Sequence, residues 1–561
     1  MKKILPAISV LTAAFLVLIF LNLVHETAVN LPIWDDFDSA FFFVNRILET
    51  PFWADRAILI LEQHNEHRIL INRLLTLLSL ALFSSINFLF LIYCAIAALV
   101  TLALTLPAKT ENRWLGLVIS TAILLQPQYG DGLNWVTTCL ASFSLCLLAF
   151  TCSHLVFGSR TQFFFAILLM ALACFSQGNG ILLPLCLIIV LLMHRRWTRA
   201  AGIAASGAAI IGCYFIGFRF PPRSNTLEML ISRYPEVLEY GFTLVGNAAG
   251  FSDPAASLTS GVVLTLLFFG LMCTAKTRAH PALISLTLFL FFSAGINTLA
   301  RGLSGSQWAL SPGRYTILGA GILATLSLML LENIRLRSLK AALVAAALAF
   351  NYCSWQFYRS SVEELQTTAI NDVAKHLLRG DGLTYPWPER GIPIFDKALA
   401  NNIFNLEAVI TDLRLHQRVN APLLPAVVAK KDLRSRFDRI QGGPAYLVIE
   451  GWGFLKGCLS SETETVITLN HPEDQVVVAP RPKFRGDVAD LFKKQDRGRS
   501  GFITMIPKRF LKEQLSYEVN AVLICGGRMA RMATPYRVST AGVDKTQPAD
   551  SPQEPRPASE N

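Results

Sequence analysis

The residues best suited to chemistry lie in the first hydrophilic loop, residues 25–68. Three carboxylates stand close together there, at Asp35, Asp36 and Asp38, beside Trp34. A carboxylate can act as a general base that removes a proton from a hydroxyl group, and charge next to apolar segments is usually retained for function. We therefore predict Asp35 and Asp36 as catalytic residues and Trp34 and Asp38 as substrate contacts. The competing interpretation is an ordinary polar loop between membrane helices.

The end of this loop, residues 62–68, holds a second group of ionisable side chains. It supplies four candidate substrate contacts, His64, Glu66, His67 and Arg68, and Arg68 could also bind a phosphate. His64 and His67 are three residues apart with glutamates near them, an arrangement that could hold a divalent metal. The spacing differs from the His-Glu-x-x-His pattern of metal-binding helices. We therefore predict polar contacts to substrate here, and no cofactor.

Three later polar segments interrupt the apolar sequence, at residues 126–135, 176–180 and 301–315. They carry aromatic, carboxamide and arginine side chains. Guanidinium groups match the oxygens of a phosphate in a two-pronged contact, whereas the alternative role of an arginine at a helix end is to reach lipid headgroups. The candidate substrate contacts in these segments are Asp131, Asn134, Gln177, Asn179, Arg301, Arg314 and Tyr315.

The elements that must position these residues are apolar helices. The chain has 561 residues, of which 53% are hydrophobic and 16% charged, which is too apolar for one soluble domain. Apolar runs of about 20 residues, the length that crosses a bilayer as a helix, recur from Ile4 to Trp355. We predict a polytopic α-helical membrane protein with about 11 transmembrane helices and one short re-entrant or interfacial helix at residues 69–83.

Lysine and arginine gather in alternate loops, and this bias sets the predicted topology. Residues 4–24 lack a small-residue cleavage site, so we expect an uncleaved helix with a cytoplasmic N-terminus. The basic loops, predicted to be cytoplasmic, are residues 109–113, 159–160, 194–199, 276–280 and 335–340. The loops poor in lysine, predicted to lie outside with the first loop, are residues 126–135, 177–180, 219–256 and 301–314. The net charge of +11 forms no basic stripe with interleaved aromatic residues, so no nucleic-acid partner is predicted.

The composition changes after Trp355, and strand patterns replace helical ones toward the end of the chain. Alternating apolar residues indicate strands at residues 446–449, 465–469, 475–478 and 517–524. If this region is exported, Cys458 and Cys525 can form a disulfide. We predict a transmembrane catalytic domain, a helical connector, a β-sandwich accessory domain and a disordered tail, at residues 1–357, 358–440, 441–541 and 542–561.

The first loop and the helices after it resemble the GT-C superfamily of integral-membrane glycosyltransferases. The resemblance covers residues 1–356 and rests on the uncleaved first helix, the acidic pair Asp35-Asp36, the ionisable residues 64–68 and the short second helix. It implies a polyprenyl-phosphate-linked sugar donor and a first-loop aspartate as base, either Asp35 or Asp36. The C-terminal region is similar to a β-sandwich module of bacterial glycan-related proteins, at residues 451–454, 485–488, 501–502 and Tyr517.

These observations give one functional hypothesis and two alternatives. The hypothesis is a glycosyltransferase in the bacterial inner membrane that moves a sugar from a polyprenyl-phosphate carrier to a cell-surface glycan, such as O-antigen, or to a surface protein. Its partners would be the lipid bilayer, the lipid-linked donor and the glycan or glycoprotein acceptor. The alternatives are a transporter or flippase of lipid-linked saccharides and a non-catalytic envelope assembly protein. A transporter is expected to carry mid-membrane charges and internal repeats, and neither is evident in the sequence.

Overall fold

The computed structural model describes residues 4–220, 225–310, 313, 315–380, 385–412, 417–418, 432–526 and 528–545. The chain forms two compact units, which are described separately. The helical unit contains Met1–Gln366 and Tyr385–Phe404, and the sandwich unit contains Thr367–Thr384 and Asn405–Asn561. One long helix, α18 (Arg337–Arg379), contributes residues to both units.

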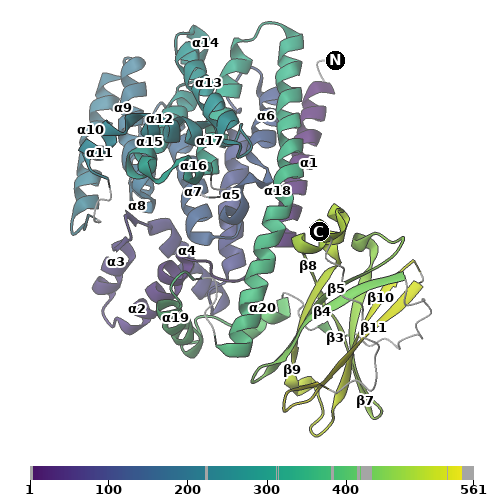
Figure 1. The fold of residues 1–561 in the computed structure, drawn as a ribbon. Helices are drawn as coiled ribbons and strands as arrows, with labels where there is room; N and C mark the ends of the chain where they lie inside the picture. Colours follow the sequence, from purple (N-terminus) through teal and green to yellow (C-terminus); the bar gives the residue numbers. More distant parts are fainter. Residues whose placement is uncertain are drawn as a thin grey trace. The chain divides into compact units, whose positions relative to one another are not determined.

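Six helices within the described ranges are long and apolar enough to cross a membrane, as a multi-pass membrane protein requires (Figure 1). They are α1 (Ile4–Thr27), α5 (Phe88–Thr105), α7 (Val136–Leu155), α13 (Pro254–Met272), α15 (Pro281–Arg301) and α17 (Thr316–Asn333). The expectation of about 11 spans is therefore too high by this criterion.

Three of the four short apolar helices account for most of this difference, because the fourth, α4 (Leu70–Phe83), is the segment that was predicted to be re-entrant or interfacial and was not counted as a span. The apolar helices α4, α6, α8 and α9 cover Leu70–Phe83, Arg113–Leu124, Arg160–Ser176 and Leu183–Met193. Even the longest of them, at 17 residues, rises about 26 Å at about 1.5 Å per residue, less than the roughly 30 Å hydrocarbon core. Polar and glycine-containing sequences beside them form the 3₁₀ turns η2 (Pro127–Leu133) and η3 (Gly178–Leu182) instead of extending the helices.

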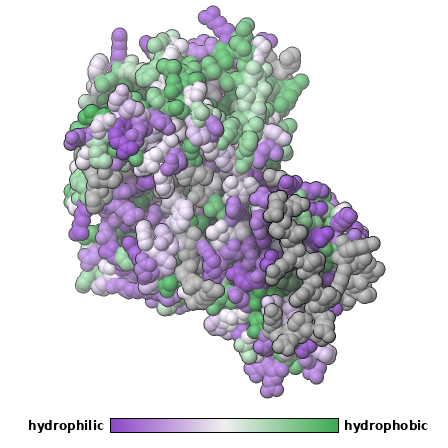
Figure 2. Space-filling model, viewed as in Figure 1, coloured by the Kyte–Doolittle hydropathy of each residue, from purple (hydrophilic) through white to green (hydrophobic). Residues whose placement is uncertain are grey.

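Hydrophobic and hydrophilic residues cover different parts of the helical unit. On the face drawn in Figure 2, hydrophobic residues (green) gather over its upper helices and hydrophilic residues (purple) over its lower part. The lower part corresponds in Figure 1 to α2 (Phe43–Glu49), α3 (Trp53–Leu61), α4 and α19 (Pro388–Ala400). The remaining helices of this unit are α10 (Trp197–Phe215), α11 (Leu227–Ser232), α12 (Tyr234–Gly246), α14 (Ala275–Arg278) and α16 (Ser306–Leu310).

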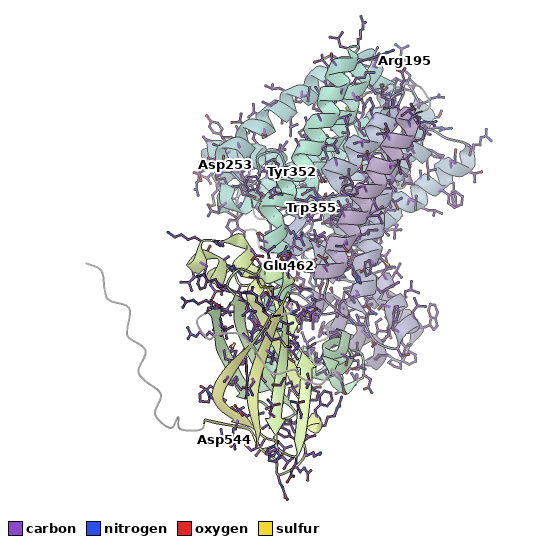
Figure 3. All side chains as sticks on the ribbon, turned by 90° about the vertical axis from the view of Figure 1, so that its right-hand side faces the viewer. Arg195, Asp253, Tyr352, Trp355, Glu462 and Asp544 are labelled. Atoms are coloured by element: carbon purple, nitrogen blue, oxygen red, sulfur yellow. A yellow bond between two sulfur atoms is a disulfide. The ribbon has the colours of Figure 1, made fainter. Side chains whose placement is uncertain are left out.

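Local sequence signals fix where several of these helices begin. Helix α8 starts with a capping box, in which the Ser159 hydroxyl accepts a hydrogen bond from the Gln162 amide and the Gln162 side chain accepts one from the Ser159 amide. Helix α13 starts after Asp253 (Figure 3), whose carboxylate accepts from the Ala256 amide at 2.8 Å. Pro254 follows as the first helical residue, where its missing N–H costs no hydrogen bond.

The loops predicted to share the outer side meet at one end of the helical unit, which we call the polar end. Hydrogen bonds join loops that are far apart in sequence: Asn134 to the Thr27 carbonyl, Gln128 to that of Ala248, Gln63 to that of Arg219 and Asn225 to that of Ala300. A Cβ added to Gly132 would lie 3.0 Å from the backbone of Gly313, so the loops at 126–135 and 301–315 are also in close contact. The loops that were predicted to lie outside are therefore close to one another in the structure.

The basic loops meet at the opposite end, which we call the basic end. The buried carboxylate of Glu332 accepts hydrogen bonds from the backbone amides of Glu111 and Asn112, at 3.1 and 3.0 Å. Lys276 donates to the carbonyl of Glu332, and Lys340 donates to the side chain of Asn112. A second cluster of basic loops contains Arg195, which labels this end of the unit at the top of Figure 3.

Helix α4 begins and ends at the polar end. It follows the β-hairpin of β1 (Gln63–His64) and β2 (His67–Arg68). After its last residue, the Ile86 amide donates to the Ile403 carbonyl and the Phe88 amide donates to the side chain of Asn30, both at 2.7 Å. Both ends of α4 thus lie among residues of the polar end. A short re-entrant or interfacial helix, as predicted at residues 69–83, requires this arrangement.

The sandwich unit consists of two antiparallel sheets. One sheet has the order β12-β11-β10-β6-β7-β3, and the other has the order β4-β5-β9-β8. The strands are β3 (Gln417–Arg418), β4 (Leu433–Gly442), β5 (Tyr446–Leu455), β6 (Glu464–His471), β7 (Asp474–Ala479), β8 (Arg481–Lys483), β9 (Gly501–Pro507), β10 (Tyr517–Cys525), β11 (Arg528–Val538) and β12 (Val543–Lys545). The helices α20 (Leu406–Asp412) and α21 (Gly486–Phe492) complete the unit. All four strands predicted from alternation lie within β5, β6, β7 and β10.

One hydrophobic core lies between the two sheets. Leu447 and Ile449 from β5 pack in the same cluster as Ile467 from β6 and Leu523 from β10, which is the arrangement of a β-sandwich. A disulfide between Cys458 and Cys525 joins the segment after β5 to the end of β10. The sequence left this bond open, and the structure contains it. Glu462 and Asp544 lie at opposite ends of this unit in Figure 3.

The limits of the two units differ from the predicted domain limits. The helical unit extends to Gln366, and the segment Tyr385–Phe404, which the sequence placed in a connector, belongs to the helical unit. Strand β4 begins at Leu433, inside the predicted connector, and β12 lies inside the predicted tail. Residues 546–561 of that tail are outside the described residues.

Candidate functional site

Asp36 is a buried acceptor that fastens the first loop to helix α7. Its side chain has no exposed surface. Its two oxygens accept from the backbone amides of Ile33, Val136 and Thr137 at 3.0, 3.2 and 2.7 Å, and from the Thr137 hydroxyl at 2.6 Å. Val136 and Thr137 are the first residues of α7, where backbone amides lack partners inside the helix and favour an anion. Asp36 therefore has a structural part at this site.

The protonation of Asp36 reflects two opposed effects. Burial raises the pKa of its carboxyl group from 3.8 to about 7, and the hydrogen bonds from Thr137, Ile33 and Val136 oppose this rise by stabilising the anion. Because the carboxyl is enclosed and all four of these groups donate to it, an acceptor hydroxyl cannot reach it in this conformation. This geometry disfavours Asp36 as the predicted base, and Asp35 remains the candidate.

Asp38 is bound by a segment that lies 347 residues further along the chain. Its carboxylate accepts from the Tyr385 hydroxyl and from a guanidinium nitrogen of Arg390, each at 2.6 Å. The Asp38 side chain is 11% exposed, while that of Arg390 is 58% exposed. Burial, together with the hydrogen bond and charge of Asp38, raises the pKa of the Tyr385 hydroxyl, so this hydroxyl donates at neutral pH. Asp38 holds this segment in place.

Asp35 lies next to Asp36 in the sequence and is half-buried. The residue before it, Trp34, has φ of 48°, a conformation that is rare and strained for a side chain of this size. The Trp34 ring lies edge-on to Trp135, with 4.7 Å between the ring centroids. The negative charge of Asp35 contributes to the raised pKa of Tyr385, so the two groups are close. Trp34 and Trp135 thus form an aromatic wall beside Asp35.

The hairpin β1-β2 brings two neutral histidines to the same end. Burial lowers the pKa of His64 to about 4, and the positive charges of Arg73 and Arg390 add to the effect, while Asp38 opposes it. Burial also lowers the pKa of His67, with Arg301 adding to the shift and Glu66 opposing it. Both rings are therefore uncharged at neutral pH and can donate or accept a hydrogen bond. Glu66 lies 4.0 Å from His67.

The turn at residues 177–180 lies against this hairpin. A Cβ added to Gly178 would lie 2.9 Å from Nδ1 of His67, so the close approach requires glycine. The neighbouring candidates Gln177 and Asn179 are half-buried. The break between α8 and η3 thus brings carboxamide side chains to the polar end, as the sequence predicted.

The contacts of Arg68 are structural and do not fit the prediction that it binds a phosphate. Its guanidinium donates to the backbone carbonyls of Leu61, Tyr214 and Ile216. Its side chain is 7% exposed and lies over the ring of Phe175. Three of its five N–H donors are bonded to carbonyl oxygens and the side chain is buried, so little of this guanidinium is open to an anion.

Arg301 differs from Arg68 in the contacts of its guanidinium group. Its guanidinium lies 5.8 Å from the centre of the Tyr315 ring, a distance typical of a cation–π contact. Within the described part of the chain it makes no hydrogen bond or ion pair. Because its charge lowers the pKa of His67, it lies near the hairpin. Arg301 is thus a cation at the polar end with donors available for an anion.

Three other predicted contacts have different outcomes. Asn134 is buried, and its amide donates to the Thr27 carbonyl at 3.3 Å, which makes it a link between loops. The side chain of Asp131 and all of Arg314 lie outside the described residues. Among the residues that are described, no three histidine, cysteine or carboxylate side chains gather closely enough to hold a metal.

Sequence reasoning missed the segment Tyr385–Phe404, which we call the strap. Besides the bonds from Tyr385 and Arg390 to Asp38, Asn401 bonds to Asn45 at 2.7 Å. Phe395 and Phe404 of the strap pack with Phe37 and Phe41 of the first loop. The signal that could have found it is the sequence Tyr385-Pro-Trp-Pro-Glu-Arg390, which places two aromatic residues and a cation in a stretch otherwise assigned to a connector.

The comparisons with known proteins add no relative. No protein-family model matches this chain, and no curated protein matches it either.

Proposed function

We propose that the protein is a glycosyltransferase that moves a sugar from a polyprenyl-phosphate carrier to a glycan or protein acceptor outside the cytoplasm of a bacterial cell. The observation that carries this proposal is the meeting, at one end of a membrane bundle, of a carboxylate, an arginine that bonds to no described residue and aromatic rings. These groups are Asp35, Arg301 and the pair Trp34–Trp135. The reaction needs a base, a phosphate ligand and a surface for sugar rings.

In the proposed reaction, Asp35 accepts the proton of an acceptor hydroxyl. The hydroxyl oxygen then forms a bond to the anomeric carbon of the sugar, and the bond from that carbon to the carrier phosphate breaks. The electron pair of the broken bond stays on the phosphate, which leaves as an anion. Arg301 stabilises this anion by charge and by hydrogen bonds.

Asp35 is favoured as the base over its two neighbours because of what they contact. Asp36 is enclosed by four donors, and Asp38 is held by the strap. A proton acceptor must reach within hydrogen-bond distance of its substrate, and Asp35 is half-buried at the edge of the aromatic wall. The neutral imidazoles of His64 and His67 are suited to orienting sugar hydroxyls.

The arrangement of charge supports an enzyme over a transporter or flippase. The ionisable groups of the candidate site lie in loops, in the hairpin and, for Arg301, at the last residue of α15, rather than in the middle of the six candidate membrane helices. Transporters commonly place charged or broken segments at mid-membrane, where they bind their cargo. The groups described above instead gather where a lipid phosphate and a water-soluble acceptor could meet.

The test is a transfer assay with purified protein in nanodiscs and a panel of polyprenyl-phosphate sugars. We expect the wild type to transfer at least one sugar to a glycan acceptor, and Arg301→Ala to lower the rate about 100-fold. Arg233→Ala is the matched control, because Arg233 is an exposed arginine that pairs with Glu236, and it is expected to leave the rate unchanged. Donor movement across the bilayer without any transfer would identify a flippase and overturn the proposal.

A further inference from the structure

The sandwich unit contains a cavity of about 400 Å³. Its volume lies within the roughly 300 to 1,000 Å³ that is usual for small-molecule sites. The last turns of α18, the strand β4 and the strand β11 surround it. Its lining residues are Lys375, Leu378, Asp438, Arg439, Ile440, Gln441 and Tyr536.

Local backbone features shape this cavity. The pairing of β4 with β5 shifts register between Phe437 and Arg439, so a β-bulge falls at Asp438. A bulge bends its strand and redirects the side chains beside it. At the other end of β4, the glycine turn packs against α18, where a Cβ added to Gly443 would lie 2.3 Å from the Leu377 carbonyl. The strand is therefore fixed against the helix on one side of the cavity.

The charges of the lining residues are compensated inside the protein. Asp438 pairs with Arg485 and Arg436. Arg439 pairs with Glu450, and Lys375 lies 3.0 Å from Asp372. The cavity therefore presents little net charge to a ligand, although it offers charged hydrogen-bonding groups.

One buried donor in the wall has no partner. The Nε–H of Arg439 is buried and forms no hydrogen bond with any described residue. Buried donors are nearly always hydrogen-bonded, and leaving one unpaired costs free energy. Because Nε itself is enclosed, a ligand in the cavity would contact other atoms of the Arg439 side chain, which lines the wall.

We propose that this cavity binds an uncharged saccharide. A sugar hydroxyl can accept from Arg439, Gln441 or Lys375 and donate to the carboxylate of Asp438, which suits a wall with both kinds of group. Leu378, Ile440 and the ring of Tyr536 offer apolar area for the C–H faces of a sugar ring. An anion such as phosphate would suit Arg439 and Lys375 but would be repelled by Asp438. This binding site does not depend on the transfer reaction proposed for the helical unit.

The experiment measures binding of methyl glycosides of glucose, galactose, mannose, rhamnose, arabinose and N-acetylglucosamine to the full chain in nanodiscs, with inorganic phosphate as the charged probe. We expect at least one glycoside to bind and to slow amide hydrogen exchange in peptides that cover β4 and the end of α18. Gln441→Ala, a change at an exposed position, should weaken this binding about fivefold. Tyr536→Ala should weaken it more, and Tyr536→Phe should restore it, because the ring and not the hydroxyl supplies the apolar area.

Gln475→Ala is the matched control, because Gln475 is an exposed glutamine on β7 that does not line the cavity. It should bind like the wild type. The proposal fails if no glycoside in the panel binds, if the bound glycoside protects other peptides, or if Gln441→Ala and Gln475→Ala bind equally well. Phosphate binding that Gln441→Ala weakens would also overturn it and would make the cavity an anion site.

Discussion

The two ends of the helical unit each contain one buried carboxylate, yet they differ in what surrounds it. At the basic end, the Glu332 carboxylate accepts hydrogen bonds from two backbone amides. The nearby Lys276 and Lys340 belong to the same hydrogen-bond network. At the polar end, Asp36 accepts from three backbone amides in the same way.

The two ends differ in the groups beside the carboxylate. At the basic end, Lys276 donates to the Glu332 carbonyl and Lys340 donates to the Asn112 side chain, so both lysines help to join the loops. At the polar end, Arg301 lies over the Tyr315 ring and makes no ion pair among the described residues, and Asp35 is half-buried next to the aromatic wall. A buried carboxylate that accepts several hydrogen bonds, such as Glu332 or Asp36, therefore holds segments of the chain together, and we call it a structural joint. Catalytic residues are to be sought among the groups that such a joint positions.

The largest expected effect on stability comes from removing the Asp36 carboxylate, the structural joint at the polar end. Asp36→Ala leaves three buried amides and the Thr137 hydroxyl without their acceptor, and we expect the free energy of unfolding to fall by about 3 to 5 kcal/mol. Thermal unfolding in detergent measures this. Asp55→Ala, at an exposed position of α3, is the control and should change stability by less than about 0.5 kcal/mol. If both variants unfold alike, Asp36 is not a joint.

The pH dependence of stability sharpens the account of Asp36. Its pKa is about 7 in the folded protein, against 3.8 as the ordinary value, so the folded state binds more protons between these pH values. The contribution of this group to stability is fully present below about pH 4 and is lost as the pH rises through 7. We expect the wild type to lose about 1.5 kcal/mol relative to Asp36→Asn between pH 5.5 and pH 7. A difference that stays constant over this range would mean that Asp36 remains ionised throughout.

A smaller effect is expected from loosening the strap. Asp38→Asn removes the charge that holds Arg390, and because Arg390 is largely exposed we expect a loss of about 1 kcal/mol. The sharper measurement is hydrogen exchange, which should increase in peptides from Tyr385–Phe404 and remain unchanged at the basic end. Lys397→Ala, which breaks the exposed pair with Glu49, should increase exchange less. Equal exchange in Asp38→Asn and the wild type would show that the aromatic contacts alone hold the strap.

Patterns that depend on neighbouring residues could be predicted from the sequence. The apolar patterns located β5, β6, β7 and β10, because each of these strands places side chains such as Leu447 and Ile467 in the sandwich core. The lysine and arginine bias, which depends on composition alone, predicted two sets of loops, and loops of the same set contact each other in the structure. The predicted number of membrane-crossing helices was too high because apolar segments counted as spans, such as those that form α6 and α9, give helices of only 12 and 11 residues.

Contacts between distant segments could not be predicted. Nothing near Asp38 indicates that its partners are Tyr385 and Arg390, and nothing near Arg68 indicates that it binds the carbonyls of Tyr214 and Ile216. The types of the three aspartates are identical, so only their burial and partners separate them. The sequence indicated the loop at residues 25–68 as the candidate site. The fold is needed to distinguish the contacts of Asp35 from those of Asp36 within this loop.

The most direct test of the central claim is a single-turnover transfer rate for Asp35→Asn beside Asp36→Asn, each with bound donor and with rates corrected for the folded fraction. We predict that Asp35→Asn keeps the thermal stability and donor affinity of the wild type but transfers sugar 100-fold to 10,000-fold more slowly, in the range expected for loss of a general base. Asp36→Asn should lose stability and keep most of its rate per folded molecule. A normal rate in Asp35→Asn, with the loss of rate found in Asp36→Asn instead, would contradict the assignment of structure to Asp36 and chemistry to Asp35.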